Sequence, residues 1–248
     1  MSKPITADMP LTKMNIINPD MQIRHEITAS LRAHGNLIYD FTRAWYASPY
    51  TFQGTKFMGF EACKIPLDLW VLQDLFCQYK FQTVVETGTA GGGTTLWYAV
   101  LMDLLGIDGH IYSIDLDDTP TRPTHPRITY LYGSSIDPAI AARVELKGPV
   151  LLNLDSNHLA SHVLAELELW APRVPVGDWL LVEDTNGSPV IEDPLTGQLE
   201  QVEGPMAAVM EYLAKHPGEF LRDVVCERYW LTMNPHGWLQ RVRGCEHG

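Results

Sequence analysis

Between residues 82 and 183, short apolar runs alternate with longer segments of helical periodicity, and this alternation constrains the fold more than any other feature of the chain. Strands buried on both faces of a sheet read as continuous apolar runs, whereas helices repeat their apolar positions every three to four residues. The strand–helix–strand order therefore predicts an α/β fold with a mostly parallel, doubly wound sheet and helices on both faces. The expected strands are Gln82–Glu86, His110–Ile114, Ile128–Leu131, Pro149–Leu154 and Trp179–Glu183, and the expected helices are Pro66–Phe76, Thr94–Leu105, Asp137–Glu145, His158–Trp170 and Gly204–Lys215.

The two ends of the chain lack this alternation. Residues 1–20 carry three prolines and little periodicity, so we expect an arm there, and residues 21–44 have helical spacing. Residues 45–60 are rich in aromatic side chains and predict a packed loop or a lid. Near the C-terminus, residues 223–227 and 229–233 predict a hairpin-like pair of strands. We therefore expect an N-terminal arm, helix and aromatic loop over 1–60 and one α/β domain over 61–248.

Composition excludes several classes of partner. The formal net charge is -12 and no Lys/Arg cluster forms a stripe, so a nucleic acid would be repelled. No apolar run approaches the roughly 20 residues of a membrane span, and the N-terminus does not resemble a signal peptide. The four cysteines form no C-x-x-C pair, which favours a reducing compartment. We expect a soluble, cytoplasmic protein, and an N-terminal arm of this kind often lies across a neighbouring subunit of a homo-oligomer.

The sharpest local motif is a glycine-rich turn after the first expected strand. Glu86 ends the strand, Gly88 and Thr89 follow, and Gly91, Gly92 and Gly93 lead into a helix. Glycines allow backbone to approach a ligand, and a helix start offers free N–H groups, so the turn predicts a cofactor site. The spacing G-x-x-G-G-G differs from the dinucleotide fingerprint G-x-G-x-x-G. A purely structural turn is the alternative.

Two later positions extend the expected cofactor site. Asp115 ends the second strand, where nucleotide-binding sheets place an acid that accepts hydrogen bonds from ribose hydroxyls. Asp117 and Asp118 compete for that role. Ser134 follows the third strand and is placed to meet the edge of an adenine, although Ser135 or Asp137 in the same turn could simply cap the next helix.

Two more strands also end in acids, Asp155 after one and Glu183 with Asp184 after the other. The carboxyl ends of parallel strands share one edge of the sheet, so these side chains can converge beside the glycine turn. Carboxylates gathered in this way repel one another unless a cation joins them, and oxygen ligands suit Mg²⁺. The alternative is that the acids cap the elements that follow them, above all Asp155 before the expected helix at 158.

Taken together, these motifs resemble the cephalosporin hydroxylase and rhamnosyl O-methyltransferase family of class I methyltransferases. The matching stretches are Val85-Glu-Thr-Gly-Thr-Ala-Gly-Gly-Gly, Ser113-Ile-Asp-Leu-Asp, Leu154-Asp-Ser-Asn-His, Leu167-Glu-Leu-Trp-Ala-Pro, Val182-Glu-Asp-Thr-Asn-Gly, Gly204-Pro-Met and Leu231-Thr-Met-Asn-Pro-His-Gly-Trp-Leu. They run in order from about residue 60 to the C-terminus and leave the first sixty residues uncovered. One departure is Ala90-Gly-Gly-Gly-Thr, where similar members have Ala-His-Gly-Gly-Ser.

The resemblance implies a Rossmann-like, seven-stranded methyltransferase sheet with one antiparallel strand near its edge. It implies S-adenosylmethionine and Mg²⁺ as cofactors. The implied metal ligands are Asp155, Glu183 and Asp184, and the implied cofactor-binding residues are Glu86, Gly88, Thr89, Gly92, Asp115, Ser134 and Asp155.

The expected reaction is metal-assisted methyl transfer to a hydroxyl of a small acceptor, such as a sugar, a phenol or a modified β-lactam of secondary metabolism. His158 is the nearest candidate for a general base, with Asp155 beside it, and His162 is a weaker one; a capping or exposed histidine is the alternative for His158. Trp45, Tyr50 and Phe52 could cover the acceptor, although aromatic clusters more often serve packing.

Two other functions stay open at this point. An NAD-dependent oxidoreductase would use the glycine turn and Asp115 but has no use for three acids at the strand ends. A non-catalytic S-adenosylmethionine-binding partner in a biosynthetic complex would not need those acids either.

Overall fold

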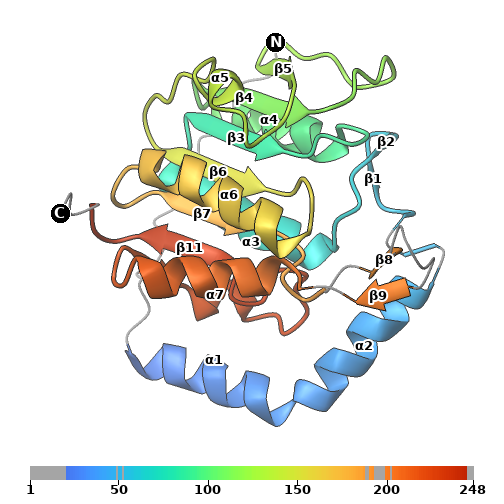
Figure 1. The fold of residues 1–248 in the computed structure, drawn as a ribbon, viewed down its shortest axis with the longest axis vertical. Coiled ribbons are helices and arrows are strands. Elements are labelled where there is room, and N and C mark those ends of the chain that lie inside the picture. Colours follow the sequence, from blue (N-terminus) through green and yellow to red (C-terminus); the bar gives the residue numbers. More distant parts are fainter. Residues whose placement is uncertain are drawn as a thin grey trace.

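A computed structural model describes residues 21–48, 50–51, 53–187, 190–192, 199–201 and 203–244. The residue 1–20 arm and Phe52, both named above, lie outside the described residues. A seven-stranded sheet of order β10-β11-β7-β6-β3-β4-β5 forms the centre (Figure 1). Its strands are β3 (Thr83–Thr87), β4 (His110–Asp115), β5 (Ile128–Tyr132), β6 (Val150–Leu154), β7 (Trp179–Val182), β10 (Phe220–Arg222) and β11 (Trp238–Arg241).

Five neighbouring strands run parallel, and β11 alone is antiparallel to its neighbours β7 and β10. The expected mostly parallel sheet with one antiparallel strand near its edge is thus confirmed. The four strands β3, β6, β7 and β11 carry the most buried side chains, as their continuous apolar sequences predict. Their carboxyl ends, apart from that of β11, therefore meet along one edge.

Helices cover both faces of the sheet. The helices α5 (Pro138–Ala141), α6 (Ala160–Trp170) and α7 (Pro205–Lys215) lie on one face, where α6 and α7 stand in front of the sheet in Figure 1. The helices α3 (Pro66–Tyr79) and α4 (Gly93–Leu105) pack on the other face. Buried apolar side chains fill both layers, with Leu167 and Val209 on the first and Leu72 and Met102 on the second. The α5 segment is a single turn, shorter than the helix expected over 137–145.

The expected hairpin-like pair at 223–227 and 229–233 is misplaced: an antiparallel pair does end the sheet, but it is formed by β10 and β11. Residues Val224–Glu227 form the 3-10 helix η2, and the two terminal strands lie on either side of this region, at β10 and β11. Asp223 explains the difference, because its side chain accepts a hydrogen bond from the Val225 N–H at 3.0 Å and so starts a helical turn. A further 3-10 turn, η1 (Ala171–Arg173), follows α6.

The N-terminal part consists of two helices that bury no residue, α1 (Met21–Ala33) and α2 (Gly35–Ala47). Figure 1 shows them at one end of the molecule, beyond α7. Arg24 of α1 pairs with Asp223 at 2.9 Å, and the His34 ring stacks on Trp230 with centroids 4.1 Å apart. Helix α2 continues through Ala47, so Trp45 belongs to a helix and not to the loop expected there.

Two small antiparallel hairpins complete the described structure. The first joins β1 (Lys56–Phe57) to β2 (Phe60–Glu61), and the second joins β8 (Val190–Glu192) to β9 (Leu199–Gln201). Among the described residues, no helix combines the length and the apolar character needed to cross a membrane.

Candidate active site

A cavity of about 710 Å³ opens at the carboxyl ends of β3, β4 and β6. Of the residues expected to bind the cofactor, five line it and two do not. Those that line it are Gly88, Thr89, Asp115, Ser134 and Asp155; Glu86 and Gly92 are absent from its wall. The volume suits a ligand of several hundred daltons, since such sites commonly span about 300–1,000 Å³.

The glycines of the turn allow close contacts with different parts of the chain. Gly88 has φ +83°, and a Cβ there would lie 1.9 Å from the Asp155 carbonyl oxygen, so this glycine lets the ends of β3 and β6 meet. A Cβ on Gly93 would lie 2.5 Å from the Glu61 carbonyl oxygen of the β1–β2 hairpin. The interpretation that all four glycines make room for a ligand is therefore only partly right. Some of them admit other parts of the chain.

Glu86 lies beneath the cavity and is almost fully buried. Its carboxylate accepts hydrogen bonds from Thr95 and from Ser113, the latter at 2.7 Å. Ser113 in turn lies 2.7 Å from the Thr89 hydroxyl, which lines the cavity. Burial raises the pKa of Glu86 to about 7. Glu86 thus supports the turn from below.

Asp115 lies at the cavity wall, where the Asp117 N–H donates to its Oδ1 at 3.3 Å and its Oδ2 accepts two shorter bonds. Arg122 donates to that oxygen at 2.7 Å, and the Ala90 N–H donates to it at 3.0 Å. Arg122 is buried and also donates to the carbonyl oxygens of Ala90 and Asp117. Sequence reasoning missed Arg122, because a single arginine in a loop carries no local pattern.

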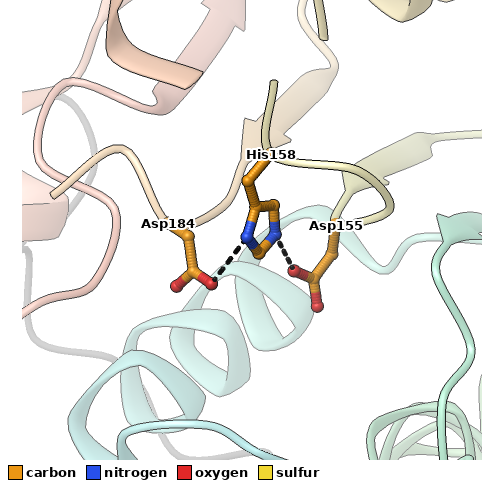
Figure 2. Close-up of side chains that lie close together, drawn as sticks. All are labelled: Asp155, His158 and Asp184. Carbon is orange, nitrogen blue, oxygen red and sulfur yellow. Dashed lines mark hydrogen bonds and ion pairs between the residues drawn. The ribbon is translucent and has the colours of Figure 1, made fainter. Parts of the chain in front are cut away.

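Asp155, His158 and Asp184 form a cluster at the cavity, and Figure 2 shows the imidazole between the two carboxylates. Nε2 of His158 lies 3.3 Å from Asp155 Oδ1, and Nδ1 lies 3.5 Å from Asp184 Oδ2. One candidate ligand atom from each residue lies within 4.8 Å of the others. Burial lowers the pKa of His158, but the hydrogen bond to Asp155 and the charge of Asp184 outweigh it and raise the pKa to about 9.

Helix capping does not explain this cluster. Helix α6 begins at Ala160 and its N-cap is Leu159, so neither Asp155 nor His158 caps it. Asp137, by contrast, does cap α5 through its bond from the Ala139 N–H at 2.8 Å. His162 lies apart from the carboxylate cluster, with Nε2 3.1 Å from the hydroxyls of both Ser135 and Ser156.

Glu183, the third expected metal ligand, lies behind the other two. It is almost fully buried, and Lys64 donates to its Oε2 at 2.5 Å and also to Asp155 Oδ2. The other carboxylate oxygen, Oε1, is buried and has no hydrogen-bond partner among the described residues. Burial lowers the pKa of Lys64, but the charges of Asp155 and Glu183 outweigh it and raise that pKa well above its usual value. Sequence reasoning missed Lys64.

Helix α2 borders the carboxylate cluster. The Tyr46 hydroxyl donates to Asp184 Oδ1 at 3.4 Å and to Asn186 Oδ1 at 3.2 Å. The Trp45 ring stacks on Phe41 with centroids 5.9 Å apart, whereas Tyr50 is largely exposed. Tyr46 is thus the aromatic residue of this segment whose polar atom reaches the carboxylates. The aromatic lid of Trp45, Tyr50 and Phe52 stays a prediction.

The strand order, the antiparallel strand β11 and a cavity lined by a glycine-rich turn define a class I methyltransferase fold. The protein-family model for rhamnosyl O-methyltransferase/CmcI matches residues 50–242, and the chain belongs to this family. Rhamnosyl O-methyltransferases from Mycobacterium tuberculosis and Mycobacterium leprae are each 31% identical to it. These matches cover 79% of this chain and 82% and 87% of the respective relatives.

The solved structures agree on the fold. A structure of CmcI with Mg and SAM superposes with a TM-score of 0.61 at 21% identity, covering 80% of this chain and 83% of that one. The CmcI apo-structure gives a TM-score of 0.61 at 21% identity and covers 79% of each chain. As a member of its family, the chain is an S-adenosylmethionine-dependent O-methyltransferase. The comparisons support neither the NAD-dependent oxidoreductase nor the non-catalytic partner considered above.

Proposed function

We propose that the chain transfers a methyl group to a hydroxyl of a sugar or of a small secondary metabolite, with assistance from Mg²⁺. The observation that carries this proposal is the convergence of Asp155, His158 and Asp184 at one edge of the cavity. The mycobacterial relatives are named for rhamnosyl O-methyl transfer, which favours a sugar hydroxyl.

The residues present fit a magnesium ion. Asp155 and Asp184 offer carboxylate oxygens at the cavity, and Glu183 adds a buried oxygen that lacks a hydrogen-bond partner. Such a donor set suits a hard cation more than zinc, which favours nitrogen and sulfur ligands. We propose that Asp155, Glu183 and Asp184 hold the ion. When bound, Mg²⁺ lowers the pKa of an acceptor hydroxyl and steadies a neighbouring oxygen.

The cavity also fits the methyl donor. We propose that Gly88 and Thr89 contact its aminoacyl part, that Asp115 accepts from the ribose hydroxyls and that Ser134 faces the adenine edge. Arg122 fixes the Asp115 carboxylate for this role. Glu86 and Gly92 act indirectly, since neither lines the cavity: Glu86 steadies Thr89 through Ser113, and Gly92 forms the turn at φ +76°.

His158 is the proposed general base. The acceptor oxygen forms its bond to the methyl carbon while the methyl–sulfur bond breaks, and the hydroxyl proton passes to the imidazole. Asp155 orients the ring through its hydrogen bond. Because the hydrogen bond to Asp155 and the charge of Asp184 raise the pKa of His158, a cation held by these residues would lower that pKa and leave the ring free to accept a proton.

Two broader assignments also belong to this proposal. We propose that residues 61–248 form the catalytic domain, with 1–60 as an N-terminal extension, in a cytoplasmic homo-oligomer. The exposed helices α1 and α2 support a role for that extension outside the core. Light scattering of the full chain tests the oligomer, and a single monomer mass at micromolar concentration would contradict it.

Calorimetric titration of S-adenosylmethionine, followed by assay with rhamnosides and catechols, tests the function. We expect one-to-one binding of the donor and a product one methyl group heavier, formed only when Mg²⁺ is present. Donor binding without methylation of any hydroxylated acceptor would rule out a sugar or secondary-metabolite hydroxyl as the acceptor. No binding of the donor or its demethylated product would remove the proposal altogether.

A further inference from the structure

Lys64 joins two members of the carboxylate cluster formed by Asp155, Glu183 and Asp184. Its Nζ donates to Glu183 Oε2 at 2.5 Å and to Asp155 Oδ2, and its side chain is only 6% exposed. The expected function gives this lysine no role.

The backbone around Lys64 is fixed in a way that aims the side chain inward. Its N–H donates to the Thr55 hydroxyl at 3.0 Å, and the next residues, Ile65 and Pro66, form the N-cap and the first turn of α3. Cys63, just before it, adopts a left-handed conformation at φ +50°. Because its side chain is buried and its Nζ binds two carboxylates, Lys64 has little freedom to leave the cluster.

The cluster needs a positive charge whenever no metal is present. Glu183 is almost fully buried, and Asp155 and Asp184 are partly buried close to one another, so repulsion among the three carboxylates, together with the desolvation of Glu183, favours unfolding. His158 reaches Asp155 and Asp184, but among the described residues only Lys64 bridges Asp155 and Glu183. A divalent cation at the same oxygens would meet the positive charge of Lys64 at short range.

We propose that Lys64 is the built-in counter-ion of the carboxylate cluster, which holds Asp155 and Glu183 in place when the metal is absent and opposes metal binding. This inference rests on the proposed magnesium site. Lys64 is a positioning residue, since it acts through the carboxylates and not on the reacting atoms. Its opposition weakens Mg²⁺ binding and thereby favours exchange of the ion over permanent retention.

The test uses Lys64→Met, which keeps the length of the stem and removes the charge. Thermal unfolding in EDTA and calorimetric titration of Mg²⁺ alone are measured for the metal-stripped wild type and the variant. In EDTA, we expect the variant to unfold several degrees lower. In the titration, we expect its Kd for Mg²⁺ to be at least about tenfold lower, because a close like charge has been removed. Lys147→Met, at an exposed lysine paired with Glu145, is the matched control and should change neither value.

A second variant separates charge from packing. Lys64→Met combined with Glu183→Gln removes one anion together with the cation, so in EDTA it should recover part of the lost melting temperature. If the double variant stays as unstable as Lys64→Met, the loss comes from packing and the proposal fails. The proposal also fails if Lys64→Met is as stable as wild type in EDTA, or if its Mg²⁺ affinity is unchanged or weaker.

Failure of the metal assignment looks different from failure of this inference. If neither protein binds Mg²⁺, the proposed magnesium site is wrong, and so is the proposal that Lys64 opposes Mg²⁺ binding. The unfolding data in EDTA then still decide whether Lys64 is the counter-ion of the cluster.

Discussion

Asn234 holds the backbone of Asp184, because its side-chain oxygen accepts the Asp184 N–H at 2.9 Å. Its amide group donates to the buried Asp68 at 3.2 Å, and Asp68 also accepts the Met233 N–H. Asp184 itself lies in the left-handed region at φ +52°, a conformation that a non-glycine residue keeps only when its surroundings impose it. Asp68 of α3 and Asn234 of the segment before β11 are thereby linked to a proposed metal ligand.

Asn234→Ala should loosen Asp184, because its N–H loses its partner, and should remove one of the hydrogen bonds to the Asp68 carboxylate. We expect a stability loss of about 1–3 kcal/mol and a Mg²⁺ affinity weaker by about tenfold or more. Urea unfolding and Mg²⁺ calorimetry measure the two effects, with the exposed Asn36→Ala as control. Unchanged Mg²⁺ affinity in a destabilised variant would limit Asn234 to a structural role.

Removal of the metal, or of Asp155, should abolish methyl transfer without abolishing the fold. Chelation should stop product formation, and added Mg²⁺ should restore it. Asp155→Ala should bind Mg²⁺ too weakly to detect by calorimetry, since it loses one of the proposed carboxylate ligands. Full activity of the wild type in EDTA would rule out metal assistance.

His158→Gln should lower kcat by about 100-fold to 10,000-fold if the imidazole removes the hydroxyl proton. S-adenosylmethionine affinity should stay within about twofold, since the base acts on the acceptor. His162→Gln is the matched control, because that ring contacts serines and lies apart from the carboxylate cluster. A smaller kcat loss in His158→Gln than in His162→Gln would exclude His158 as the base.

Gly93→Ala should destabilise the turn by about 1–3 kcal/mol, because the new methyl would lie 2.5 Å from the Glu61 carbonyl oxygen. A methyl group at Gly35 would have no atom within 4 Å, and Gly35 is the first residue of α2. Gly35→Ala should therefore be neutral or stabilising. Urea unfolding of the two variants makes the comparison. Equal stabilities would show that the β1–β2 hairpin does not rest on the turn.

The stability of the ligand-free protein should depend on Glu86 and on pH. Burial raises the pKa of Glu86 from 4.5 to about 7, so between these values the folded state holds a proton that the unfolded state has lost. The contribution of Glu86 to stability therefore falls as pH rises through this window. Glu86→Gln should remove that fall, so its stability relative to wild type should rise by about 2 kcal/mol between pH 5 and 8. A difference that is constant with pH would contradict the raised pKa.

The sheet could be predicted from the chain because its strands are buried on both faces. Thr83–Thr87, Val150–Leu154 and Trp179–Val182 are continuous in burial as in apolar character, so local pattern and tertiary environment agree. The carboxylates could be placed together for a related reason, since parallel strands end at one edge. The strand expected at 223–227 did not form. A hydrogen bond from the Val225 N–H to the Asp223 side chain favours a helical turn there, and it outweighs the preference of Val224 and Val225 for strands.

The partners of the acidic strand ends could not be predicted in this way. Lys64 lies 91 residues before Asp155 and 119 before Glu183, and Asn234 lies 50 residues after Asp184. No periodicity joins such positions, because their contacts form only when α3 and the segment before β11 pack against the edge of the sheet. Local patterning thus identified the fold and its acidic residues, whereas long-range packing assigned a counter-ion to Glu183 and a fixed backbone to Asp184.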